Sequence, residues 1–422
     1  MKHLVKKYLS GGTLLLGSIM IVNAINFVFN AYLGRVLTFE EFGLVTLVNT
    51  FLYIAVVLFS ALYATVNHKV AYLLGKGPTH ASIPFLTQTN KHVLVISLGI
   101  SVLWLIFIPF LDRFFQINNF LVPFLFTPII TLGALTATNK GFLQGIFNFK
   151  SVAIIIIAEA ISKLLFAWMF VSAHLTAWVY VVIPLSVLFA FLLSMWMLAE
   201  NKQTSEKSVP AIHFPRKFFV AFIITGLSST AFLTFDLLLA KHFLPPVEAG
   251  QYALLSLIGK MVYFFGTLPN ALMITFVSND EGSNRDSRFS FYKLFAIAAT
   301  LSMGAFLIIG LFGSMLIPFL FGSKTEVILP YLTTYAAGIA LFAISLIIVS
   351  YHLAKRQYFF PICAIFAAVL MSVGIIFFHA NIEQITHVIF YSSLISFFII
   401  SFFHILEMYT NISLTERFST AS

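Results

Sequence analysis

Charged residues are scarce in this sequence. Lys, Arg, Asp and Glu make up 9% of the 422 residues, whereas hydrophobic residues make up 60%. A soluble globular chain carries roughly 25% charged residues, so the composition excludes an ordinary soluble fold. The chain also has a single cysteine, Cys363, so it cannot form an internal disulfide. A lone cysteine gives no information about the redox compartment.

Several functional motifs are also missing. No glycine-rich loop of the Walker type is found, which argues against direct use of ATP. The histidines, among them His68, His174 and His387, are scattered without the spacing of metal ligands. We therefore predict no cofactor and no metal. The short alternating segments of a transmembrane β-barrel are not seen either.

Long apolar runs dominate the sequence instead. A helix needs about 20 apolar residues to cross the hydrocarbon layer with every backbone group bonded internally. We therefore predict an all-α integral membrane protein with about twelve transmembrane helices. The predicted spans cover residues 11–33, 42–64, 92–111, 120–138, 151–172, 176–198, 217–240, 249–277, 291–313, 328–351, 358–378 and 386–406. The polar connection after the sixth span predicts two six-helix bundles, residues 1–207 and 208–422.

Lys and Arg are distributed unevenly among the predicted connections. If the N-terminus is placed in the cytoplasm, 18 of these residues fall in inner segments and 4 in outer loops. Cytoplasmic connections are enriched in Lys and Arg, so we expect both termini to be cytoplasmic. The net charge of +9 then acts as an insertion signal. Membrane lipids are expected partners, and nucleic acid is not.

The two predicted halves share a short pattern after their first spans. At a constant offset of 207 residues, four identical pairs are Leu37 with Leu244, Glu41 with Glu248, Gly43 with Gly250 and Leu47 with Leu254. Thr38 with Glu41 fits a capping box, and Pro246 suits the first position of a helix. Both copies run in the same direction. The pattern therefore predicts a parallel repeat, with two bundles around a central cavity.

Three stretches carry a family resemblance. They are Asn30 to Leu37 with Glu41 to Gly43, Gly141 to Phe149, and Asp236 with Glu248 to Ala253. In these stretches the chain resembles the polysaccharide transporter family of O-antigen and capsule flippases, within the multidrug, oligosaccharidyl-lipid and polysaccharide flippase superfamily. The resemblance implies ion-coupled, alternating-access transfer of undecaprenyl-pyrophosphate-linked oligosaccharides across the bacterial inner membrane. It also implies a polysaccharide polymerase and its chain-length machinery as partners.

Four ionisable residues lie inside predicted spans, where each costs about 2.5 to 3.5 kcal/mol on insertion scales. One interpretation is that Lys163 and Lys260, one in each half, line the cavity and attract the pyrophosphate, while Glu159 or Asp236 couples transport to an ion. The other is that the charges only neutralise one another. Glu159 would then pair with Lys163, four residues away on one helix, and Asp236 with Lys260 or Lys241.

Further polar candidates lie in the first half. Asn23, Asn26 and Asn30 form one stripe of the first span, at i, i+3 and i+7. They are expected either to bind sugar hydroxyls in the cavity or to bond a neighbouring helix. Lys140 lies at the inner end of the fourth span, where its ammonium is expected to meet the pyrophosphate of the cargo. The distribution of Lys and Arg already accounts for this lysine, however.

Other functions remain open at this point, because one fold hosts many cargoes. The chain is alternatively a cation-coupled multidrug exporter or a lipid II flippase of the same superfamily, although the latter usually has two more spans. A membrane glycan polymerase or ligase would carry a large outer loop with catalytic residues. The predicted outer loops, such as residues 111–119 and 321–327, are short. We therefore do not expect an enzyme.

Overall fold

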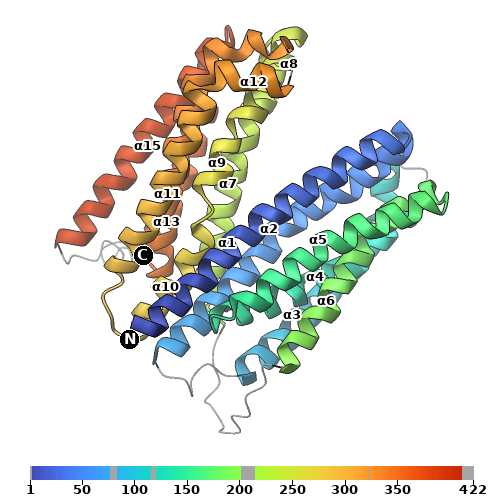
Figure 1. Ribbon diagram of the computed structural model, residues 1–422, viewed down its shortest axis with the longest axis vertical. Helices are drawn as coiled ribbons and strands as arrows, with labels where there is room; N and C mark the ends of the chain where they lie inside the picture. Colours follow the sequence, from blue (N-terminus) through green and yellow to red (C-terminus); the bar gives the residue numbers. More distant parts are fainter. Residues whose placement is uncertain (1, 77–82, 116–119, 201–213, 322, 411–422) are drawn as a thin grey trace. The chain divides into compact units, whose positions relative to one another are not determined.

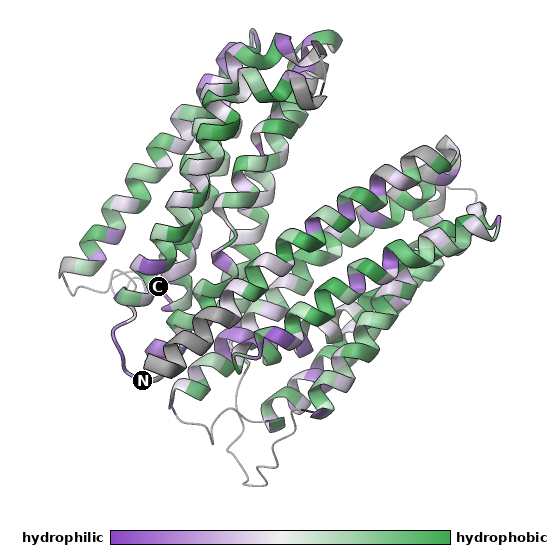
Figure 2. Ribbon diagram, viewed as in Figure 1, coloured by the Kyte–Doolittle hydropathy of each residue, from purple (hydrophilic) through white to green (hydrophobic). Residues whose placement is uncertain are grey.

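The computed structural model describes residues 2–76, 83–115, 120–200, 214–321 and 323–410. In these ranges all regular structure is helical, and twelve helical stretches are long and apolar enough to cross a membrane. The predicted all-α class and number of spans are therefore confirmed. Hydrophobic residues predominate along the long helices (Figure 2). Large apolar side chains such as Phe27 and Ile106, 74% and 67% exposed, lie at the surface.

The chain divides into two compact units, and each holds six of the spans. The first comprises residues 1–219 with 282–284, and the second comprises residues 220–281 with 285–422. The predicted boundary between residues 207 and 208 lies outside the described residues. It stays a prediction.

In the first unit, long helices run alongside one another (Figure 1). They are α1 (Lys2–Val36), α2 (Phe39–Lys76), α3 (Ile83–Phe115), α4 (Leu121–Gly145), α5 (Phe149–Ser172), the 3-10 turn η1 (Thr176–Val181) and α6 (Val182–Glu200). The rings of Phe51, Trp104 and Phe126 meet in the core at centroid distances of 5.0, 5.1 and 5.6 Å. The indole N–H of Trp104 donates to the carbonyl of Pro123 at 2.8 Å. These contacts pack α2, α3 and α4 against one another.

The second unit has more interruptions. Its elements are α7 (Arg216–Phe243), α8 (Pro246–Gly259), α9 (Met261–Gly266), α10 (Asn270–Gly282), α11 (Arg288–Phe306), the π-helical segment η2 (Leu307–Leu311), α12 (Gly313–Phe321), the 3-10 turn η3 (Ser323–Ile328), α13 (Leu329–Ala354), α14 (Phe359–Phe377) and α15 (Ile382–Thr410). The predicted eighth span, residues 249–277, is divided among α8, α9 and α10. Pro269, which has no N–H to donate, lies in the break before α10. The rings of Phe232 on α7 and Phe342 on α13 stack at 3.8 Å.

The sequence repeat has a structural counterpart. α2 begins at Phe39 and α8 at Pro246, the same offset of 207 residues that relates the two sequence segments. A second correspondence lies in the turns after α4 and α13, where Phe147 and Arg356 have φ angles of 61° and 64°. Both turns close with the same backbone hydrogen bonds of a left-handed helix cap. The two halves are therefore alike in local structure as well as in the number of spans.

Candidate functional site

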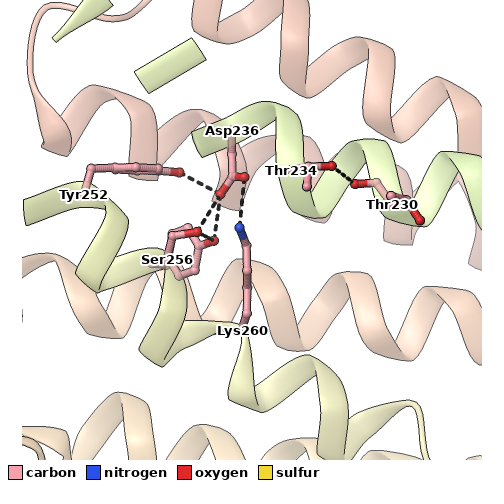
Figure 3. Close-up of polar contacts among 7 residues, drawn as sticks. Thr230, Thr234, Asp236, Tyr252, Ser256 and Lys260 are labelled. Carbon is pink, nitrogen blue, oxygen red and sulfur yellow. Dashed lines mark hydrogen bonds and ion pairs between the residues drawn. The ribbon is translucent and has the colours of Figure 1, made fainter. Parts of the chain in front are cut away.

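Asp236 on α7 is the centre of a polar cluster inside the second unit (Figure 3). Its carboxyl group is buried, with the residue 1% exposed. The ammonium of Lys260 lies 3.1 Å from Oδ1, while the hydroxyls of Tyr252 and Tyr335 donate to Oδ2 at 2.9 and 2.8 Å. The hydroxyl of Ser256 donates to the same oxygen at 3.3 Å. Four donors thus satisfy a carboxylate that would be costly to bury alone.

The local sequence explains how most of this cluster assembles. Tyr252, Ser256 and Lys260 are spaced at i, i+4 and i+8, so they lie on one face of the eighth span and point to Asp236 (Figure 3). Tyr335 comes from α13, and its hydroxyl also lies 3.1 Å from that of Ser256. Gly259 leaves room for that ring, because a Cβ there would lie 2.2 Å from Cδ1 of Tyr335.

Sequence reasoning found only part of the Asp236 cluster. Asp236 and Lys260 were predicted from the sequence. The structure pairs them, as expected if the intramembrane charges neutralise one another. Sequence reasoning missed Tyr252 and Ser256, which their spacing relative to Lys260 would have revealed. No local signal marks Tyr335, which is 99 residues from Asp236. The predicted roles of these residues in transport stay predictions.

Lys163 is an intramembrane cation of the first unit. Its ammonium, on α5, donates to Oδ1 of Asn26 on α1 and lies 4.7 Å from the ring centroid of Phe29. The ion pair between Glu159 and Lys163, which one of the two interpretations required, is not formed as a direct contact, although the charge of Glu159 acts on the Lys163 ammonium from one turn away. The carboxylate of Glu159 lies 3.7 Å from the ammonium of Lys140, because α4 packs beside α5 and brings its own lysine to the acid. Lys163 is left half-buried with an uncharged hydrogen-bond partner.

The predicted asparagine stripe does not converge on one site. Asn26 contacts Lys163, but the amide of Asn30 donates to the backbone carbonyl of Asn26 at 3.0 Å, and the side chain of Asn23 is exposed. The structure therefore brings Asn26 to Lys163 and Lys140 to Glu159. Since Glu159 and Lys163 are one turn apart on α5, the two pairs are neighbours in the first unit.

Thr38 and Glu41 form the predicted capping box at the start of α2. The N–H and hydroxyl of Thr38 donate to Oε2 of Glu41 at 3.0 and 2.9 Å, and the N–H of Glu41 donates to the Thr38 hydroxyl at 3.3 Å. The hydroxyl of Thr176 in η1 donates to Oε1 at 2.5 Å. These bonds, with that from Thr176 the largest, lower the pKa of Glu41 below its ordinary value of 4.5. Glu41 is thus a cap that joins α2 to η1.

The fold defines an all-helical protein of twelve apolar spans in two six-helix halves. No family model and no curated protein matches the sequence. Solved structures do match the fold. A MOP superfamily transporter from Pyrococcus furiosus has a TM-score of 0.81 at 12% identity, over 95% of each chain. An outward-facing multidrug resistance MATE family transporter of the MOP superfamily has a TM-score of 0.79 at 13% identity, over 94% of this chain and 95% of that one.

A third solved structure is similar to the same extent. A MATE protein in the straight conformation has a TM-score of 0.79 at 11% identity, over 95% of each chain. At such identities the likeness establishes the fold alone. The chain therefore has the MATE transporter fold.

Proposed function

We propose that this protein is a flippase of the inner membrane, which moves undecaprenyl-pyrophosphate-linked oligosaccharides from the cytoplasmic to the periplasmic leaflet by alternating access. One finding supports a transporter: the fold is shared over nearly the whole length with solved structures of transporters. The family resemblance of the three sequence stretches supports the oligosaccharide cargo.

Lys163 carries the proposal for an anionic cargo. A charged group in a membrane span costs several kcal/mol unless a partner or water stabilises it. The contacts of the Lys163 ammonium are an amide oxygen and an aromatic ring, both uncharged. Together with Lys140 it places two cations beside the single carboxylate of Glu159. The local excess of positive charge favours a pyrophosphate over a cationic molecule.

Ion coupling belongs, in this proposal, to two carboxylates, the buried Asp236 and the half-buried Glu159. Asp236 is held by donors from α8 and α13. A proton or metal cation bound to its carboxylate would compete with Lys260 and the hydroxyl donors, so the packing of three helices would change. Glu159 is a second coupling candidate, because release of its pair with Lys140 would alter the contact between α4 and α5.

A cation-coupled multidrug exporter is the second candidate function. It is favoured by the fold neighbour described as a multidrug resistance MATE family transporter. The Pyrococcus furiosus neighbour is described as having a binding pocket of reverse polarity that suggests a different function. Because the polarity of the pocket differs within this fold, the charge of the site is a better guide to this chain than the fold.

A comparison of two cargoes in vesicles tests the proposal. The purified protein is reconstituted, and transfer of a fluorescent polyprenyl-pyrophosphate oligosaccharide is measured beside transport of a cationic dye. We expect transfer of the lipid and none of the dye above protein-free vesicles. Dye transport without lipid transfer would establish the second candidate and overturn the first. Heat-inactivated protein is the control for leakage.

A further inference from the structure

A chain of four polar side chains lies where α13 ends and α15 passes it, in the second unit. His352 is fully buried and His404 is 8% exposed. Nε2 of His352 lies 2.8 Å from Nδ1 of His404. On the other side of its ring, Nδ1 of His352 bonds to Oε1 of Gln357, whose Nε2 donates to Oε1 of Glu407 at 2.5 Å. Neither the repeat nor the Asp236 cluster uses these residues.

The fold builds this chain of side chains at the end of α13. Arg356 has a φ angle of 64°, and this turn brings the N–H of Gln357 to the carbonyl of His352 at 2.9 Å. The side-chain amide of Gln357 therefore folds back onto the imidazole of His352. The His352 ring stacks flat on Phe360, with centroids 3.5 Å apart and planes 1° apart. His404 and Glu407 are three residues apart, so they share one face of α15.

The charge at one end of the chain fixes the tautomer of each imidazole. An ionised carboxylate only accepts hydrogen bonds, so Gln357 must turn its NH₂ group to Glu407 and its oxygen to His352. The proton of His352 is then on Nδ1, and its Nε2 accepts. His404 must donate from Nδ1, which leaves the lone pair of its Nε2 open. Over the residues that the structure describes, that nitrogen has no hydrogen-bond partner.

We infer that Nε2 of His404 is a proton-binding site, separate from Asp236. One proton adds to the open lone pair, the imidazole becomes an imidazolium, and the three hydrogen bonds keep their direction. No bond breaks in this step. The bond from His404 to His352 becomes charge-assisted and stronger. The inference requires neither of the proposed cargoes.

The charged groups around the site give proton binding a structural consequence. Lys355, at the end of α13, is the cation that acts on both imidazoles. Arg288 of α11 contacts the end of α15, where its guanidinium donates to the carbonyl of Met408 at 3.0 Å. Glu407 is the acid on α15. Protonated His404 therefore repels Lys355, attracts Glu407 on its own helix and binds His352 more strongly, so proton binding redistributes the polar contacts between α13 and α15.

Nitrogen NMR of the full-length protein in lipid nanodiscs, labelled with ¹⁵N-histidine, tests this inference. The His404→Gln variant identifies the His404 signals by their loss. We expect both rings protonated at Nδ1 at neutral pH, and His404 alone of the two to gain an Nε2 proton before the protein unfolds in acid. His92→Gln, an exposed histidine of α3, is the matched control and leaves this titration unchanged.

The Glu407→Gln variant provides an independent check of the hydrogen-bond direction. Without the carboxylate, Gln357 is free to reverse its amide, and we expect His352 to become a mixture of tautomers. A neutral His404 ring with its single proton on Nε2, or an Nε2 of His404 that stays unprotonated down to the pH of unfolding, would overturn the inference. A single, unchanged His352 tautomer in Glu407→Gln would overturn it as well.

Discussion

The hydroxyl of Tyr335 on α13 donates a 2.8 Å hydrogen bond to the carboxylate of Asp236 on α7, across 99 residues of sequence. Tyr252 on α8 donates to the same oxygen at 2.9 Å. One buried carboxylate therefore connects three helices of the second unit. Any change in the charge of Asp236 on α7 is transmitted to α8 and α13, because each of these two helices contributes a donor whose hydrogen bond would weaken.

Removing one of these donors should destabilise the second unit measurably. Hydrogen bonds to charged groups contribute about 1.5 to 3 kcal/mol, so Tyr335→Phe should lower the free energy of unfolding by that amount. The measurement is denaturant unfolding in detergent micelles. Tyr292→Phe is the matched control, since Tyr292 on α11 is 53% exposed. Equal stability of the two variants would show that the Tyr335 hydroxyl contributes nothing.

Gly259 should not tolerate a methyl group. A Cβ there would lie 2.2 Å from Cδ1 of Tyr335, which is fully buried. Overpacking of a buried site costs about 1 to 3 kcal/mol, so Gly259→Ala should lower the unfolding midpoint. Gly304→Ala on α11 is the matched control, because its Cβ would meet nothing within 4 Å. The cost should largely vanish in a Tyr335→Ala background, and a cost that persisted there would assign the effect to another neighbour.

The cap at Glu41 predicts a pH dependence of stability. The pKa of this carboxyl is lowered in the folded state, so its contribution is complete above the ordinary value of 4.5 and is lost as the pH falls through the folded value. Glu41→Gln should therefore unfold at a lower temperature than the wild type at neutral pH. The difference should shrink in acid, in thermal scans from pH 7 downward. A difference that grew with acidity would contradict the sign.

Asp236 should be required for ion coupling. In vesicles with an imposed proton or sodium gradient, the wild type should transport faster than without a gradient. Asp236→Asn keeps the shape of the side chain but removes its charge, so we expect transport by this variant to be slow and insensitive to either gradient. Asp286→Asn is the control, because Asp286 has a 70% exposed side chain in a connection between helices. Normal gradient dependence in Asp236→Asn would contradict a coupling role for Asp236. Glu159 and His404 would then be the remaining candidates.

Features that depend on neighbouring residues in the sequence were predictable. The twelve spans follow from apolar runs, because a helix in lipid satisfies its own backbone and needs no information from elsewhere. The cap of α2 follows from the spacing of Thr38 and Glu41, and both its bonds are present. The repeat follows from the shared offset, and the starts of α2 and α8 obey it.

Features that depend on which helices pack together were not predictable. The spacing of Glu159 and Lys163 permits an ion pair, but α4 brings Lys140 to the acid instead. Nothing local indicates that Tyr335 reaches Asp236, or that His404 reaches His352 across 52 residues. In each case the partner is selected by helix packing, which a pattern along one helix does not contain.

The transfer rate of a polyprenyl-pyrophosphate oligosaccharide by Lys163 variants most directly tests whether an intramembrane cation receives an anionic cargo. With equal amounts of protein in vesicles, Lys163→Gln should reduce the initial rate at least tenfold, equivalent to about 1.4 kcal/mol, and Lys163→Arg should retain most of it. Lys91→Gln, an exposed lysine of α3, should transfer lipid at the wild-type rate. A wild-type rate in Lys163→Gln would contradict the proposed role of this lysine.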